Sequence, residues 1–198
     1  MVDREPTTRE VIMEAALQTL RHEGSAGASA RSIAARGGFN QALIFYHFGS
    51  LEKLFIEAAD RASARQVDRY REAAQGVTTL SGLVDLARRL HHDDQESGAV
   101  TIVTQLMASA VSHPELGRAV LSGFRRWIDL VEELVEGSLE GSPLAAMIPK
   151  RQAAYAIAAV FLGMELMTGL DPTQSEAEAT LEAMGSLAAV FESWFGTA

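Results

Sequence analysis

The sequence predicts an all-α protein built from an N-terminal three-helix domain and a larger C-terminal helical domain. Apolar residues recur at three- and four-residue spacing in the long segments, and no segment shows the apolar–polar alternation of a strand. Hydrophobic residues make up 47% of the 198 positions, which is ample for a core. Near the N-terminus, two adjacent glycines separate two short helical stretches, which indicates a tight corner between helices.

Composition excludes some classes of site. The chain has no cysteine, so disulfides and thiolate metal sites are ruled out. The net charge is −9, yet residues 1–75 carry equal numbers of basic and acidic residues, so the acidic excess lies in residues 76–198. The N-terminus lacks the pattern of a signal peptide, and the apolar segment 153–170 is short and interrupted by Glu165. We expect a cytoplasmic protein that does not enter a membrane.

The first helix is predicted to begin at Thr7, because Thr7 and Glu10 have the spacing of a capping box. Gly24 is expected to end it. Between them lies an apolar stripe: Val11, Ile12, Ala15, Ala16, Thr19 and Leu20. This stripe predicts that the helix packs against the segment that follows.

That segment has the pattern of a helix-turn-helix. Ser29 is a suitable N-cap, Gly37-Gly38 ends the first helix, and Asn40 caps the second after a three-residue turn. Ile44 and Phe48 have helical spacing toward a core. The remaining polar positions suit a nucleic-acid groove, although the same pattern would also fit an ordinary two-helix corner.

Residues 7–56 resemble the DNA-binding domain of the TetR family of bacterial transcriptional regulators. The matching residues are Arg9, Ile12, Ala15, Ala16, Leu20, Gly24, Ser29, Arg31, Ile33, Ala34, Gly38, Asn40, Ile44, Phe45, His47, Phe48, Ser50, Glu52 and Leu54. The resemblance implies a regulator that binds double-stranded operator DNA, most simply a repressor released from an inverted-repeat operator by a small-molecule effector. It also implies a homodimer.

Three positions depart from the family pattern. Phe45 stands where the family usually has Tyr, Ala42 where it often has Gly, and Leu51 where a phosphate-binding Lys is common. These changes remove a hydroxyl and an amine that could contact the DNA backbone. They leave open an alternative function, a helical small-molecule carrier or sensor with weak or lost DNA binding.

The candidate DNA-binding residues lie in and around the second helix of the motif. Gln41 could read a base edge, and Ala42 and Leu43 could touch a thymine methyl group. Basic and phenolic side chains would hold phosphates, which position a protein without specifying sequence. Corner packing is the alternative for Tyr46 and His47. The full set is Arg31, Asn40, Gln41, Ala42, Leu43, Phe45, Tyr46, His47 and Lys53.

The sequence further predicts three regions along the chain. Residues 1–50 form the helix-turn-helix domain, residues 51–76 a connector helix capped by Ser50, and residues 77–198 a helical domain for effector binding and dimerisation. The connector is expected because its first half is apolar on one side and its second half is mostly polar. It would carry movement between an effector and the DNA-binding domain, as the family implies.

The segment 153–170 is apolar on nearly all sides and therefore needs cover from two directions. Together with the final helix it predicts a homodimer held by a four-helix bundle. A buried core within one chain is the alternative. The candidate dimerisation residues are Ile157, Val160, Phe161, Met184, Leu187, Phe191 and Trp194.

An effector pocket is expected between the helices of this domain, mostly apolar with a few polar groups. The candidates are Gln105, Met107, Phe124, Trp127, Phe161, Met164 and Glu165. Plain core packing is the alternative for each. A carboxylate in an apolar helix needs a partner, so Glu165 could pair across the dimer, bind a cationic effector or lie on a narrow exposed strip.

Residues 91–94, with the sequence His-His-Asp-Asp, do not predict a metal site, because adjacent side chains on a helix diverge. The sequence shows no nucleophile elbow, phosphate loop or catalytic carboxylate pair. We expect no cofactor and no enzymatic activity. An all-α enzyme using residues 91–94 is the remaining alternative.

Overall fold

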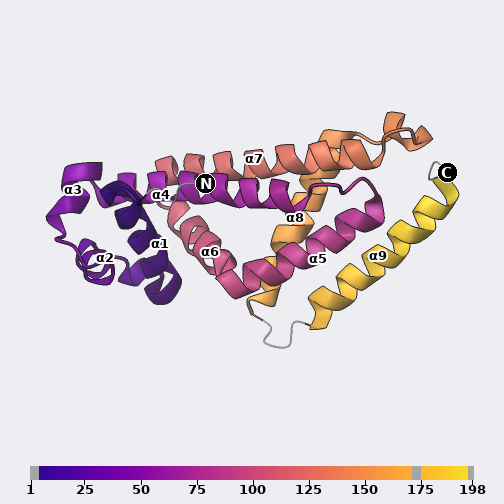
Figure 1. The fold of residues 1–198 in the computed structure, drawn as a ribbon. Helices are drawn as coiled ribbons and strands as arrows, with labels where there is room; N and C mark the ends of the chain where they lie inside the picture. The colour runs from indigo at the N-terminus through magenta and orange to yellow at the C-terminus, as the bar shows by residue number, and fades with distance from the viewer. Residues whose placement is uncertain (1–4, 171–174, 196–198) are drawn as a thin grey trace. The chain divides into compact units, whose positions relative to one another are not determined.

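The computed structural model describes residues 5–170 and 175–195, and every regular element in these ranges is a helix (Figure 1). The all-α fold class is therefore confirmed. The elements are α1 (Thr8–Gly27), α2 (Ala30–Gly37), α3 (Ala42–Phe48), α4 (Leu51–Ala73), α5 (Leu80–Ser97), α6 (Ala99–Ala110), α7 (Pro114–Ser138), the 3₁₀ turn η1 (Pro143–Ala146), α8 (Lys150–Thr168) and α9 (Ser175–Phe195). Within the described part of the chain, no helix is both long and apolar enough to cross a membrane.

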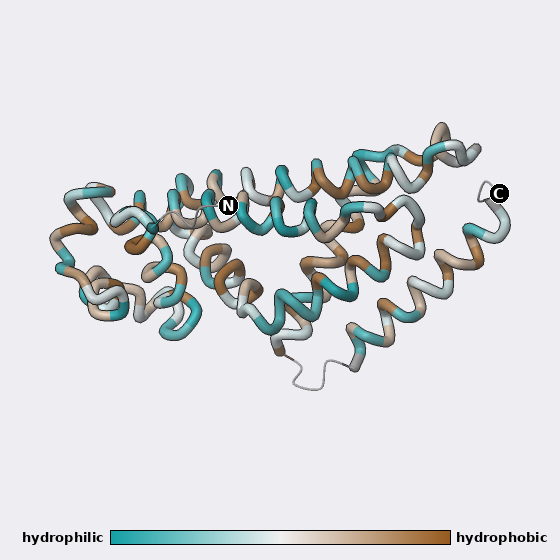
Figure 2. Tube along the Cα trace, viewed as in Figure 1, coloured by the Kyte–Doolittle hydropathy of each residue, from teal (hydrophilic) through white to brown (hydrophobic). Residues whose placement is uncertain are grey.

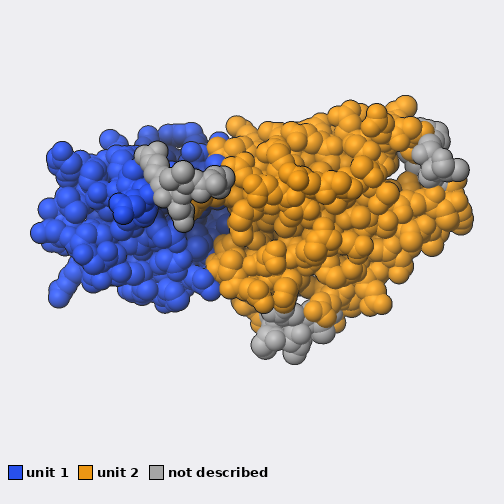
Figure 3. All heavy atoms as spheres, viewed as in Figure 1, with its two compact units in different colours: residues 1–64, 101–123 blue, residues 65–100, 124–198 orange. Residues whose placement is uncertain are grey.

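Residue contacts divide the chain into two compact units (Figure 3). Unit 1 contains residues 1–64 and 101–123, and unit 2 contains residues 65–100 and 124–198. Helices α4, α6 and α7 each contribute residues to both units. Unit 1 is thus assembled from two stretches that are separated in the sequence.

The core of unit 1 holds the first four helices together. Thr7 accepts a hydrogen bond from the Glu10 backbone, and the Glu10 carboxylate accepts one from the Thr7 backbone, so the predicted capping box is present. The apolar stripe of α1 meets buried residues from α2, α3 and α4. The buried cluster is Ile12, Met13, Ala15, Ala16, Leu17, Ile33, Ile44, Phe48, Leu54 and Ala58, with Ile102 of α6 packed against it.

A second cluster in unit 1 joins α1 and α4 to α6 and α7. Its buried members are Leu20, Ala59, Leu106 and Leu116. Helix α1 is interrupted at Gly24, whose φ of 68° lies in the left-handed region, and it resumes to Gly27 instead of ending as predicted. The Ser25 N–H that follows the break donates to Oε1 of Gln105 at 2.8 Å, so a side chain of α6 holds the end of α1.

The core of unit 2 forms between α7 and α8. Its buried members are Ile128, Val131, Val135, Leu139, Ala154 and Ala158. Helix α9 packs along α5. The carboxylate of Glu192 on α9 accepts from the Ser81 N–H and hydroxyl, both at 2.8 Å, while Thr79 caps the same helix end. A carboxylate at a helix N-terminus is stabilising, so this contact fixes α9 to the start of α5.

The complete burial of Ile44 predicts that its side chain contributes strongly to the free energy of unfolding. Its side chain is 0% exposed, so Ile44→Ala is expected to lower the free energy of unfolding by about 2–5 kcal/mol, measured by urea denaturation at fixed protein concentration. Val111→Ala is the control, because Val111 is 87% exposed and its truncation should change stability by less than about 0.5 kcal/mol. Equal effects of the two variants would contradict the packing of α3 described above.

Candidate nucleic-acid interface and buried polar cluster

Helix α2 is capped as the sequence predicts. The Ser29 hydroxyl accepts from the Ser32 N–H at 3.1 Å, and the Ser32 hydroxyl accepts from the Ser29 N–H at 2.9 Å. Gly38 follows the helix with φ 69°, a conformation that favours glycine. A Cβ on Gly37 would lie 2.2 Å from the Phe39 ring, so this glycine leaves room for Phe39 to fill the corner between the helices.

Helix α3 begins after a link of four residues, 38–41, one more than predicted. The Asn40 carboxamide oxygen accepts from the Ala42 N–H at 2.8 Å and so caps the start of α3. Asn40 was predicted both as this cap and as a DNA contact. The capping bond uses the side-chain oxygen of Asn40, so the side-chain NH₂ group is the part that could contact DNA.

The two faces of α3 differ sharply in exposure. Ile44 and Phe48 are buried against the unit 1 core, while Tyr46 is 82% exposed and Phe45 50% exposed. Gln41 and Ala42 are also exposed. We call Ala42, Phe45 and Tyr46, together with Gln41 just before the helix, the exposed face of α3. Tyr46 is therefore not packed in the corner, which was the alternative considered for it.

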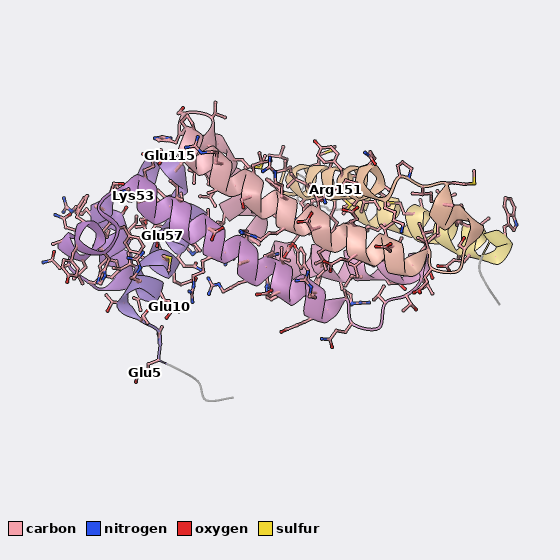
Figure 4. The ribbon with its side chains drawn as sticks, turned by 90° about the horizontal axis from the view of Figure 1, so that it is seen from above. Glu5, Glu10, Lys53, Glu57, Glu115 and Arg151 are labelled. Atoms are coloured by element: carbon pink, nitrogen blue, oxygen red, sulfur yellow. The ribbon has the colours of Figure 1, made fainter. Side chains whose placement is uncertain are left out.

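The other DNA-binding candidates are placed less uniformly. Leu43 is half-buried and packs against the unit 1 core, and His47 is half-buried, so each offers only part of its surface. Arg31 is exposed at the start of α2. Lys53 is exposed in the first turn of α4, where its N–H donates to the Ser50 hydroxyl at 3.1 Å (Figure 4). Both basic residues thus belong to helix N-terminal turns, where the helix dipole favours anions.

A buried polar cluster lies in unit 2. Glu165 is 3% exposed, and its two carboxylate oxygens lie 2.6 Å from His91 Nδ1 and 2.7 Å from Gln95 Nε2. Burial raises the pKa of Glu165, although the hydrogen bond from His91 acts in the opposite direction. Its partners lie on α5 of the same chain, and the side chain is not on an exposed strip.

Asp94 forms the other half of the cluster. It is 4% exposed and accepts from Gln66 Nε2 at 2.5 Å and from the Tyr70 hydroxyl, while Arg69 lies 3.9 Å away. Burial raises the pKa of Asp94, and burial together with Asp94 raises the pKa of Tyr70. We call these residues the polar cluster: Gln66 and Tyr70 of α4, His91, Asp94 and Gln95 of α5, and Glu165 of α8.

The cluster contains one unsatisfied nitrogen. His91 Nε2 is buried and has no hydrogen-bond partner among the residues that the structure describes. His91 and Asp94 point into the cluster, whereas His92 and Asp93 are exposed, so the four adjacent side chains diverge as the helical geometry requires. Among the described residues, no group of three or more His, Asp or Glu side chains is arranged to hold a metal ion.

The effector candidates fall in both units. Trp127 and Phe161 contact each other edge to face, with ring centroids 5.5 Å apart. Phe161 and Glu165 are four residues apart on α8, which places them on one face of that helix. Phe124 and Met164 are half-buried in unit 2. Gln105 and Met107 belong to unit 1, where Gln105 is engaged with Ser25.

The dimerisation candidates are mostly exposed in the single chain. Leu187 is 70% exposed, and Phe161 and Phe191 are partly buried. Hydrophobic positions recur along α9 (Figure 2). The exposed large apolar residues of α8 and α9, together with Leu170 just after α8, are Tyr155, Ile157, Val160, Met167, Leu170, Met184, Leu187, Val190 and Trp194. An apolar surface of this extent is characteristic of a protein interface.

Comparison with known proteins finds a family match in the N-terminal part of the chain. Residues 12–58, which include α2, α3 and the start of α4, match the family described as bacterial regulatory proteins, tetR family. The HTH-type transcriptional repressor AcnR of Corynebacterium efficiens is 27% identical over 113 residues, 57% of this chain and 56% of that protein. The HTH-type transcriptional regulator BetI of Agrobacterium fabrum is 33% identical over 81 residues, 41% of this chain and 38% of that protein.

Solved structures extend the similarity of fold to the whole chain. A transcriptional regulator from Rhodococcus sp. matches with a TM-score of 0.77 and 19% identity, covering 97% of this chain and 100% of that chain. The chain spans about half the length, or less, of the two curated relatives described above. The matched N-terminal segment and the helical fold agree with each other. Residues 12–58 therefore carry the sequence pattern of the tetR family of bacterial regulatory proteins.

Proposed function

We propose that the chain is a sequence-specific DNA-binding transcriptional regulator, a repressor that a small-molecule effector releases from its operator in the cytoplasm. The observation that carries this proposal is the exposed face of α3. Ile44 and Phe48 anchor the helix in the core, so Tyr46 and Gln41 are left accessible. A short anchored helix with exposed amide, phenol and aromatic groups suits insertion into a major groove.

The proposed active form is a homodimer. The exposed apolar residues of α8 and α9 need cover, and a second copy offers the same surface by two-fold symmetry. Four such helices, two from each copy, would form a bundle. Two copies carry two α3 helices, so the proposed operator is an inverted repeat.

The effector is proposed to bind unit 2 beside the polar cluster. The aromatic pair Trp127 and Phe161 provides apolar surface one helical turn from the Glu165 carboxylate. His91 Nε2 offers an unused hydrogen-bonding position in the same cluster. This combination of apolar walls and a few polar groups is typical of small-molecule sites. An effector that fits better when the DNA-binding units are misaligned would weaken DNA binding, and DNA would weaken effector binding by the same factor.

DNA recognition is tested by selecting bound sequences from a random duplex pool. The wild-type protein should enrich an inverted repeat. Tyr46→Ala should then weaken binding to that sequence by about 5- to 100-fold, the range for losing one good groove or backbone contact. Its melting temperature should stay nearly unchanged, because Tyr46 is exposed. Val111→Ala should bind like the wild type.

Two outcomes would contradict the proposed role of α3 in DNA recognition. Failure of the wild-type protein to enrich any sequence at low salt would favour a carrier or sensor without DNA binding. A large drop in the melting temperature of Tyr46→Ala would show that Tyr46 supports the fold.

Dimerisation is tested by placing a charge in the apolar surface. Leu187→Glu should convert the dimer to a monomer at micromolar concentration, measured by sedimentation or light scattering, because burying an unpaired carboxylate is costly. Leu121→Glu is the matched control: Leu121 is also an exposed leucine, but it lies on α7 in unit 1, and its variant should stay dimeric. A dimeric Leu187→Glu protein would argue against the proposed interface.

The buried carboxyl group of Glu165 is predicted to make the folded protein's stability depend on pH. Burial raises the pKa of Glu165 in the folded state, so the contribution of this carboxyl group to the free energy of unfolding is largest below the usual glutamate value of 4.5 and is lost as pH rises through the folded-state pKa. Glu165→Gln removes this loss, so its stability relative to the wild type should increase from pH 5 to pH 7.5 in urea titrations. Glu140→Gln, at an exposed position, should show no such trend. A Glu165→Gln difference that is constant with pH would contradict the stated cause.

A further inference from the structure

The C-terminal end of α3 is bound by one side chain from α1. Arg9 Nη1 donates to the backbone oxygen of His47 at 2.5 Å. The guanidinium carbon of Arg9 lies 4.4 Å from the centre of the Phe48 ring, and Nη2 pairs with the carboxylate of Glu57 on α4. One guanidinium therefore contacts the last two residues of α3 and the helix that follows it.

We propose that Arg9 is a positioning residue for sequence recognition: it fixes the orientation of α3, and hence of Tyr46, without itself binding DNA. This inference rests on the proposed DNA-binding function. The last carbonyl groups of a helix have no partner within the helix, and a cation near them is favoured by the helix dipole. In a helix of seven residues, a bond to His47 O constrains the whole element.

Only an arginine fits all three contacts. Its planar guanidinium can donate in two directions while its face rests on an aromatic ring. A lysine at this position would keep the charge but could not bond to His47 O and Glu57 while covering Phe48. The geometry thus explains a need for arginine that charge alone would not create.

A neighbouring ion pair holds Arg9 in register. Glu10, the next residue on α1, pairs with Arg61, which is one helical turn beyond Glu57 on α4. Glu10 and Glu57 are labelled in Figure 4. Hydrogen bonds from the Thr7 backbone and hydroxyl, together with Arg61, hold the pKa of Glu10 below its usual value. On α4, an acidic residue (Glu57) is followed one turn later by a basic one (Arg61). A shift of α1 by one turn along α4 would therefore bring Arg9 toward Arg61, or Glu10 toward Glu57, and like charges would meet. This arrangement keeps the Arg9 guanidinium at the end of α3.

Arg9→Lys tests the proposal against direct DNA contact. We expect at least about tenfold weaker binding to the selected operator, since a small misplacement of α3 spoils base contacts worth about that much. Binding to an unrelated duplex should change by less than about twofold, and the slope of log affinity against log salt should be unchanged. If Arg9 instead neutralised a phosphate, both affinities would fall and the slope would shrink by about 0.9, which would overturn the proposal.

A second measurement does not depend on DNA. Amide hydrogen exchange in α3 should be faster in Arg9→Lys than in the wild type, while exchange in α2 stays the same, because the contacts of Arg9 described above are with α3 and α4 and not with α2. Arg36→Lys is the matched control: Arg36 pairs with Glu23 at 2.6 Å and so joins α2 to α1, and its variant should leave α3 exchange and DNA selectivity unchanged. Unchanged α3 exchange in Arg9→Lys would overturn the proposal.

Glu57→Gln provides a milder perturbation that leaves Arg9 in place. It should show a smaller loss of operator selectivity than Arg9→Lys, since the bond to His47 O remains; a larger loss would overturn the assignment of that bond as the main restraint. If the wild-type protein selects no sequence, the DNA-binding function fails. In that case, faster α3 exchange in Arg9→Lys would still support the positioning role.

Discussion

A helix of seven residues cannot hold itself together in water, and the DNA-binding unit is organised around this constraint. Helices shorter than about 12 residues are marginal alone, so α3 depends on tertiary contacts. Ile44 and Phe48 supply them by packing into the core that α1, α2 and α4 share. Once that face is buried, the opposite face, with Tyr46, must be presented outward. The caps at the two ends, Asn40 and Arg9, then fix the direction of a helix that burial alone would leave free to tilt.

Unit 2 differs from unit 1 because part of its interior is polar. Glu165 and Asp94 are buried and satisfied by His91, by neutral donors and, at the edge, by Arg69. Replacing such groups by apolar residues of similar volume is often neutral or stabilising, so a cluster of this kind is poor evidence for stability. It ties α5 to both α4 and α8, and it sits one turn from the Trp127–Phe161 pair. The cluster is therefore the part of unit 2 beside which we propose that the effector binds.

The sequence predicts correctly those features that depend on residues close together in the chain. The caps at Thr7, Ser29 and Asn40, and the inward direction of Ile44 and Phe48, follow from spacing within a few residues, and the structure confirms them. The bond from Arg9 to His47 joins residues 38 positions apart, and that from Ser25 to Gln105 joins residues 80 apart. No spacing rule signals such contacts. An amphipathic pattern shows that a helix buries one side, but it does not identify the partner, so the packing of residues 101–123 against the N-terminal helices was not predicted.

The split composition of unit 1 bears on how hybrid regulators could be built from this chain. A graft of residues 1–64 onto a foreign sensor would leave Leu20 and Ala59 without Leu106 and Leu116, the buried partners that complete their cluster. It would also remove Gln105, whose side-chain oxygen accepts the hydrogen bond from the Ser25 N–H after Gly24. A DNA-binding unit that can be transferred therefore needs both residues 1–64 and residues 101–123. The recipient protein must provide the segment of chain that connects them.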